Sequence, residues 1–248
     1  MLILLPPSET KRDGGVAGSA LDLASLRFPG LSRQRRSVVA ALRKLAGNRA
    51  SMAAALHLGP TQHFEVQRNR ELRTSAVMPA LDRYTGVLFD GLDAGSLPAG
   101  SRSFALEHVV IHSALFGLIG AADAIPAYRL SHDSRLPDLS LKRTWRDAIA
   151  AQLSGRSELI LDLRSEAYVE LGPSVGAPRS YFLRVVSEGP DGTRRALNHF
   201  NKKGKGEFVR ELALAAIDHE DVDSLLRWAA DSRIRLSLSA GRELELVV

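Results

Sequence analysis

The sequence predicts an α/β protein in which helices surround a mixed sheet, and three observations indicate this class. Short apolar runs typical of buried strands alternate with stretches of helical periodicity. Two pairs of strand-like segments near the C-terminus are joined by glycine-containing turns, as in hairpins. The 248 residues, 45% of them hydrophobic, are enough to bury a substantial core. We therefore expect a single domain over residues 1–248 with both parallel and antiparallel strand pairs.

The chain is predicted to begin in the core, because Leu2–Leu5 is a continuous apolar run closed by two prolines. A largely helical subregion follows, over about residues 20–75. Its first helix has apolar residues at helical spacings behind Ser32, a candidate N-cap, and ends at Gly47. Two further helices are expected on either side of the Gly-Pro turn at Gly59.

Strands and turns dominate the predictions for the second half. A buried strand at 108–113 is expected to run into a short helix that contains Gly117 and Gly120. A second buried strand is expected at 158–163. The remaining predictions are a hairpin of 180–188 with 193–200, a helix at 221–230, and a final hairpin of 233–239 with 242–248.

Composition excludes some functions and favours others. The chain has no cysteine, which excludes thiol redox chemistry, disulfides and cysteine-ligated metals. Its net charge of +5 and pI of about 9.8 favour polyanionic partners such as nucleic acid. No apolar run approaches the roughly 18 residues of a membrane helix, and the N-terminus lacks signal-peptide features. We expect a cytoplasmic protein without a membrane partner.

The segment NHFNKKGKGEFVRELAL, Asn198 to Leu214, is the strongest candidate for an anion site. Its two glycines allow close backbone approach, and Lys202, Lys203 and Lys205 surround them with positive charge. Since helical periodicity begins at Phe208, the glycines are expected at a helix N-terminus, where phosphate groups bind. The alternative is a solvated basic turn without a ligand.

Standard motifs for nucleotide binding, metal binding and hydrolysis are missing. The sequence has no G-x-G-x-x-G, no Walker motif and no G-x-S-x-G elbow. His108 and His112 fall in the predicted strand, about 13 Å apart, which favours a structural role over metal binding. The acidic residues of 218–221 are interpreted as a helix cap. No metal site and no cofactor is predicted.

Polar residues follow several of the predicted strands. Ligands of open α/β sheets bind outside the carboxyl ends of strands, so these residues are expected to form one cleft. The alternative is that each residue simply ends its own strand. The candidates are Ser8, Glu9, Ser113, Tyr128, Arg129, Arg164, Ser165 and Glu166.

Several ordered segments resemble the YaaA family of bacterial peroxide stress proteins. They include MLILLPPSETK, RYTGVLFDGL, HSALFGLIGAADAIPAYRL and NKKGKGEFVR, and the resemblance runs from Met1 to about Arg210. Two positions depart from it. Glu9 stands where some members have the lysine of a Ser-Pro-Ala-Lys-Thr pattern, and Lys205 stands where an arginine is frequent.

The resemblance implies an α/β fold with a helix-hairpin-helix-like element, which would correspond to the helices around Gly59. It also implies binding to duplex or branched DNA and protection of DNA from iron-driven peroxide damage. The expected phosphate contacts are Lys202, Lys203, Lys205, Arg129 and Arg210, with Arg129 and Lys203 on one phosphate. An enzyme acting on a nucleotide or nucleobase in the strand-end cleft, with Lys203 added to its residues, is the alternative. A deep, enclosed pocket with a lysine or glutamate of shifted pKa favours that enzyme, and an open basic groove favours DNA.

Overall fold

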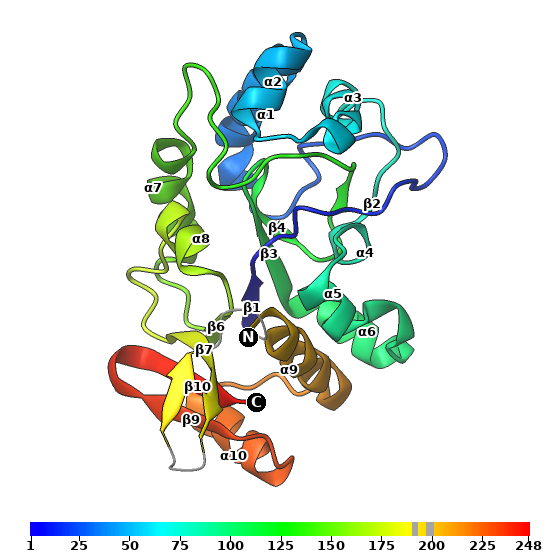
Figure 1. The fold of residues 1–248 in the computed structure, drawn as a ribbon. Coiled ribbons are helices and arrows are strands. Elements are labelled where there is room, and N and C mark those ends of the chain that lie inside the picture. The colour runs from blue at the N-terminus through cyan, green and yellow to red at the C-terminus, as the bar shows by residue number, and fades with distance from the viewer. Residues whose placement is uncertain (190–192, 197–200) are drawn as a thin grey trace.

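A computed structural model describes residues 1–189, 193–196 and 201–248, and its described part contains an eight-stranded mixed sheet (Figure 1). The strand order is β4-β3-β1-β6-β7-β10-β9, and β8 pairs with β7. This sheet confirms the predicted fold class. Its strands are β1 (Leu2–Leu5), β3 (Val109–Ser113), β4 (Gly117–Gly120), β6 (Ile160–Asp162), β7 (Ser180–Glu188), β8 (Arg194–Ala196), β9 (Leu236–Ser239) and β10 (Glu243–Val247).

The first strand lies in the middle of the sheet. Ile3 is paired in parallel with Val109 of β3 on one side and with Leu161 of β6 on the other. Every residue of β1 is buried, as the continuous apolar run predicts. Both predicted hairpins are present, because β8 pairs antiparallel with β7 and β9 antiparallel with β10.

Helices cover both faces of the sheet and extend it at one end. In Figure 1, α7 and α8 lie on one side of the sheet, α5, α6 and α9 lie on the other, and α1 to α3 form one end of the molecule. A separate two-stranded sheet joins β2 (Met78–Pro79) to β5 (Ala124–Ile125). The helices are α1 (Ser32–Ala46), α2 (Arg49–Ala55), α3 (Phe64–Arg70), α4 (Ala80–Arg83), α5 (Val87–Leu92), α6 (Ala99–His108), α7 (Leu141–Leu153), α8 (Glu166–Leu171), α9 (Asn201–Ala215) and α10 (Val222–Asp231).

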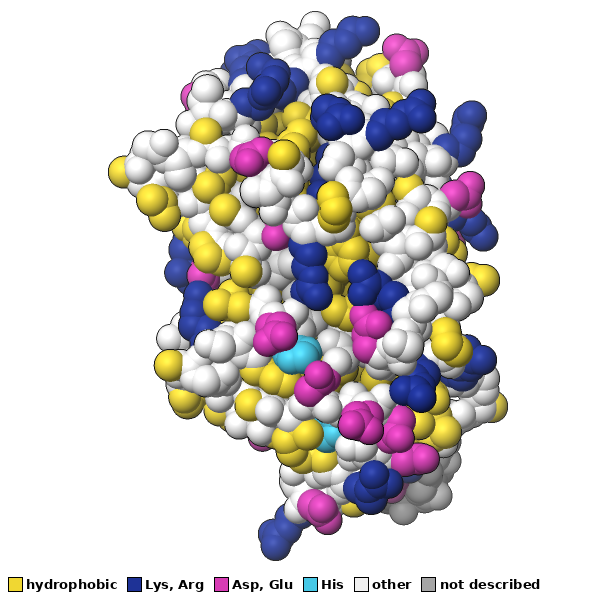
Figure 2. All heavy atoms as spheres, turned by 180° about the vertical axis from the view of Figure 1, so that it is seen from behind, with side chains coloured by type: hydrophobic (Ala, Val, Ile, Leu, Met, Phe, Trp, Pro, Cys, Tyr) yellow, Lys and Arg dark blue, Asp and Glu magenta, His cyan; other side chains and the backbone are white. Residues whose placement is uncertain are grey.

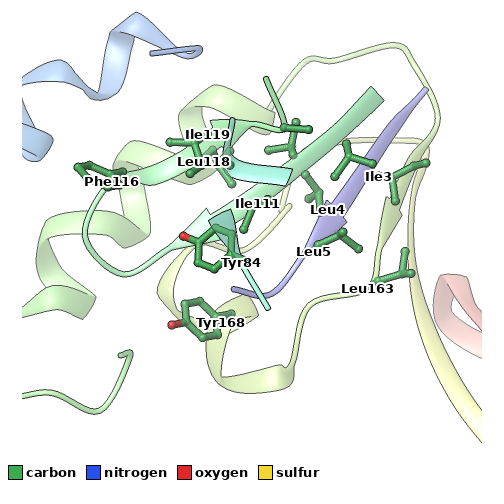
Figure 3. Close-up of a cluster of buried hydrophobic side chains, with 14 of the residues drawn as sticks. Ile3, Leu4, Leu5, Tyr84, Ile111, Phe116, Leu118, Ile119, Leu163 and Tyr168 are labelled. Carbon is green, nitrogen blue, oxygen red and sulfur yellow. The ribbon is translucent and has the colours of Figure 1, made fainter. Parts of the chain in front are cut away.

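The core gathers around β1 and β3. Figure 3 shows Leu4, Leu5 and Ile111 from these strands among buried side chains that include Phe116. Each large apolar side chain that is fully buried stabilises the fold by about 1.5–3 kcal/mol. Trp145 of α7 is completely buried, and its indole N–H donates to the carbonyl of Ala114 over 2.9 Å, so its one polar atom is satisfied.

The segment after β3 corrects one prediction. Gly117 and Gly120 bound strand β4, an antiparallel partner of β3, and do not lie in a helix. A short apolar run fits either structure by periodicity alone, and here pairing with β3 decides. Gly117 has a φ of +68°, and a Cβ there would come 2.6 Å from the Trp145 ring. Glycine is therefore required by both the turn and the packing.

The N-terminal helices are present, but the connection between α2 and α3 has a single glycine, Gly59, followed by a 3-10 turn at Pro60–Gln62. The helix-hairpin-helix-like element is therefore not confirmed. None of the described helices combines the length and the apolar composition that crossing a membrane requires.

Candidate functional site

The basic glycine segment lies inside α9, and this corrects the predicted loop. The helix begins at Asn201, so Gly204 and Gly206 belong to its first two turns; residues 198–200 lie outside the described part. A Cβ on Gly206 would overlap the carbonyl oxygen of Leu88 in α5. One on Gly204 would come 3.0 Å from Val248. The glycines therefore let α9 pack closely, which outweighs their low helix propensity of about 1 kcal/mol each.

The three lysines of this segment have different surroundings. Lys205 is only 4% exposed, and its ammonium donates to the carbonyl of Arg164 over 3.4 Å. Burial lowers the pKa of Lys205 to about 8. Lys203 is exposed, with its ammonium 3.4 Å from Glu207. Lys202 is exposed and has no described partner.

A pocket of about 640 Å³ lies at the carboxyl ends of β1 and β6. Its wall contains Ser8 and Glu9 after β1, Ser165 after β6, and Lys202 and Lys205 from α9. Three of the predicted cleft residues are thus brought together, and the start of α9 joins them. The apolar part of the wall includes Pro6, Pro7, Phe89, Leu130, Leu163 and Tyr168.

Ser113 and Tyr128 are outside the wall of this pocket and are buried. The Ser113 hydroxyl lies 2.6 Å from the Tyr128 hydroxyl, which lies 2.6 Å from that of Tyr84. The Ser113 oxygen also accepts the backbone N–H groups of Leu115 and Phe116. Burial raises the pKa of Tyr128 to about 12, so these hydroxyls stay neutral and connect β3 to the neighbouring segments.

Lys11 was missed by the sequence analysis. It is 6% exposed, and its ammonium donates to the carbonyls of Ser8 at 3.0 Å and Glu9 at 3.2 Å. The same ammonium lies 4.1 Å from the ring centroid of Tyr128. Burial lowers the pKa of Lys11 to about 7, and the charge of Glu65 opposes this shift. The sequence offered one signal for this residue: Lys11 lies two positions after Glu9, which stands where some family members have a lysine.

Arg129 is held from two sides. Its guanidinium donates to the Glu9 carboxylate over 2.6 Å. The Asn69 side chain accepts the backbone N–H of Arg129 at 2.9 Å and donates to its carbonyl at 2.7 Å. Arg129 is only 8% exposed, and its charge is already paired with the Glu9 carboxylate. Asn69 of α3 was also missed by the sequence analysis.

Arg210 caps α5. Its guanidinium donates to the carbonyls of Leu92 at 3.0 Å and Asp93 at 2.9 Å, at the C-terminal end of α5. Lys203 pairs with Glu207, whereas Arg129 pairs with Glu9. The described contacts give Arg129 and Lys203 no shared partner.

The two histidines do not share a strand, which corrects the prediction: His108 ends α6 and His112 lies in β3. The Nδ1 of His108 lies 2.9 Å from the carbonyl of Met1. The Nδ1 of His112 lies 3.0 Å from the Arg164 guanidinium, which binds Asp162 through two further nitrogens. Burial, with the charge of Arg164, holds the pKa of His112 well below its usual value. In the described ranges, no group of three or more His, Asp or Glu residues could hold a metal ion.

The acidic segment before α10 is a helix cap, as the sequence predicts. The Asp221 carboxylate accepts the backbone N–H of Ser224 over 2.8 Å. This contact satisfies one of the free N–H groups at the start of α10.

The positive charge of the chain is concentrated at the end formed by α1 to α3. Residues 29–75 contain nine arginines and lysines against two glutamates, a net charge of +7, whereas the whole chain carries +5. The rest of the chain therefore carries −2. Figure 2 shows dark-blue side chains gathered at this end of the molecule. Within residues 29–75, the exposed cations without an ion pair or hydrogen bond to a described residue are Arg33, Arg36, Arg43 and Lys44 of α1 and Arg73 after α3.

Comparison with known proteins gives consistent matches. The sequence profile of peroxide stress protein YaaA matches residues 1–232, which extends beyond Arg210 to the end of α10. A UPF0246 protein of Corynebacterium glutamicum (strain R) is 43% identical over 237 residues, covering 92% of this chain and 93% of that protein. One of Corynebacterium efficiens is 41% identical over 255 aligned positions and covers both chains completely. One of Streptomyces coelicolor is 40% identical over 218 residues, covering 86% of this chain and 82% of its own.

Proposed function

Because the chain belongs to the YaaA family of peroxide stress proteins, we propose that it protects DNA in the cytoplasm during peroxide stress by binding the phosphate backbone. Binding does not depend on base sequence. The protein has no cysteine, so it acts on DNA without sensing the oxidant through a thiol.

One observation carries this proposal, the cationic surface of α1 to α3. Arg36 and Arg43 are seven residues apart on α1, which places them on one face about 10 Å apart along the helix axis. Arg33, Lys44 and Arg73 add charge to the same region, and all five cations are exposed. Exposed cations without carboxylate partners can pair with phosphates and release counterions from DNA.

We propose this surface as the main phosphate contact, ahead of the residues expected from the sequence. Lys205 is buried in the pocket wall, Arg129 is paired with Glu9, and Arg210 caps α5. Lys202 and Lys203 are exposed, and they stay candidates for a secondary contact.

Salt titration of binding to a labelled duplex and to a four-way junction tests the proposal. If the five cations each contact a phosphate, affinity for duplex falls roughly 10²- to 10³-fold between about 50 and 200 mM salt. The double variant Arg36→Glu with Arg43→Glu should bind more weakly by at least about tenfold at low salt and show a shallower salt dependence.

The matched control is Arg143→Glu with Arg146→Glu on α7, which makes the same charge change at exposed positions elsewhere. This control should keep most of the affinity. Absence of binding at low salt contradicts the proposal. An equal loss of affinity in the two double variants also contradicts it, because the loss would then depend only on net charge and not on this surface.

A further inference from the structure

The strand-end pocket has properties that DNA-backbone binding does not require. Its volume of about 640 Å³ lies within the range of small-molecule sites, roughly 300–1,000 Å³. Its wall combines cationic side chains with an apolar portion that contains two aromatic rings, Phe89 and Tyr168. A flat phosphate backbone needs neither the depth nor the aromatic rings, whereas a small ligand with both a phosphate and a ring uses both.

Lys205 is the feature of this pocket that most needs a ligand. An ammonium has three donors, and the one described hydrogen bond of Lys205 is the 3.4 Å bond to the Arg164 carbonyl. The ammonium also lies 5.4 Å from the ring centroid of Phe182, a contact that uses no acceptor atom. The buried carboxylate of Asp162, whose charge acts on Lys205, already binds the Arg164 guanidinium through both oxygens. A lysine that is 4% exposed therefore has N–H groups without a described acceptor at the wall of the pocket.

The start of α9 adds to this positive site. Asn201, Lys202 and Lys205 all line the pocket, and the first N–H groups of this 15-residue helix have no partner within the helix. The Oδ1 of Asn201 is buried and has no partner among the described residues, so it could accept a hydroxyl or N–H of a ligand. Glu9, the acid of the wall, is engaged by Arg129.

We propose that this pocket binds a small phosphate ester with an aromatic group, in size and chemistry a nucleoside monophosphate, with its phosphate on Lys205 and Lys202 and its ring against the apolar wall. The site is separate from the cationic surface of α1 to α3. A substitution in the pocket can therefore remove binding of the phosphate ester while DNA binding is kept, and a substitution on the cationic surface can do the reverse.

Calorimetric titration with AMP, GMP, CMP and UMP, with the four nucleosides, and with inorganic phosphate tests the proposal. At least one monophosphate should bind with a Kd below about 1 mM and at least about tenfold more tightly than its nucleoside and than inorganic phosphate. Equal binding of nucleoside and monophosphate, equal binding of inorganic phosphate, or no binding by any of the four overturns it.

Variants locate the phosphate. Lys205→Met should abolish the difference between monophosphate and nucleoside. Lys203→Met, a matched change at the exposed neighbour outside this pocket, should keep the difference. The Arg36→Glu with Arg43→Glu protein should bind the monophosphate normally even where it loses DNA. An unchanged difference in Lys205→Met contradicts the assignment.

A measurement on the unaltered protein covers the case in which Lys205→Met does not fold. A bound phosphate stabilises the ammonium, so it raises the pKa of Lys205 from about 8 and takes up a proton. The charged groups around the ammonium are Asp162, Glu166 and Arg184. Affinity should decrease severalfold as pH rises from about 7 to about 9. Affinity that stays constant over this range contradicts the role of Lys205.

Discussion

Replacing Lys11 by methionine should change how the stability of the protein depends on pH. The Lys11 ammonium is buried under the Ser8 and Glu9 carbonyls and against the Tyr128 ring, and its pKa is lowered from 10.5 to about 7. The unfolded chain therefore keeps a proton on this lysine in a pH range where the folded protein has lost it. Because the unfolded state then binds more protons, stability rises with pH through this range.

The size of the effect follows from the difference in pKa. One unit of pKa corresponds to about 1.4 kcal/mol, so the Lys11 contribution to the free energy of unfolding should rise by about 2–3 kcal/mol between about pH 6 and pH 9. Below pH 7 both states carry the proton, the slope disappears, and the full cost of burying the charge is present. The methionine variant lacks this dependence.

Urea unfolding of wild type and Lys11→Met at several pH values from about 6 to 9 measures the difference, in which the titration of other groups cancels. The free energy of unfolding of the wild type should rise relative to that of Lys11→Met as pH increases. Lys203→Met makes the same substitution at an exposed position and serves as the control. A Lys11→Met difference that is constant within about 0.5 kcal/mol would falsify the reasoning.

Three further predictions concern stability. Gly206→Ala forces a Cβ onto a carbonyl of α5 and should destabilise by about 3 kcal/mol, whereas Gly100→Ala in α6 meets open space and should stabilise by about 0.5–1 kcal/mol in the same thermal melts. Tyr128→Phe removes the middle hydroxyl of the buried chain and should cost about 1–3 kcal/mol in urea unfolding, more than Tyr84→Phe at its end; the reverse order contradicts the network. Asp221→Ala removes the cap of α10 and should cost about 1 kcal/mol by the same measurement, and no loss would show that the cap is dispensable.

The fold could be predicted from the sequence where local chemistry alone decides the structure. The run Leu2–Leu5 has no polar residue and is closed by two prolines, which favours a strand buried on both faces, and the C-terminal hairpins were marked by their glycine turns. The helix expected around Gly117 was wrong because a short apolar run does not distinguish helix from strand. The structure of this run is decided by its pairing with β3, which the run itself does not reveal.

The site was predicted only in part, for a related reason. Ser8 and Ser165 follow parallel neighbours, β1 and β6, so the strand-end rule brought them together. The glycines of α9 were assigned to a ligand because a sequence shows a missing Cβ but not what approaches it, and the neighbour of Gly206 proved to be α5. Lys11 was not predicted as a site residue, because the sequence does not show that its side chain folds back and binds the Ser8 carbonyl of its own loop.

The central position of β1 has a consequence for how the protein reaches its fold. Leu2–Leu5 leaves the ribosome early, but the strands on its two sides, at Val109 and at Leu161, are synthesised much later. The centre of the sheet cannot form until both have emerged, and contacts so distant in sequence slow folding. Until then an entirely apolar strand has both edges unpaired, which is the situation that favours aggregation and chaperone binding. The nascent chain should therefore depend on chaperones most before β6 is made.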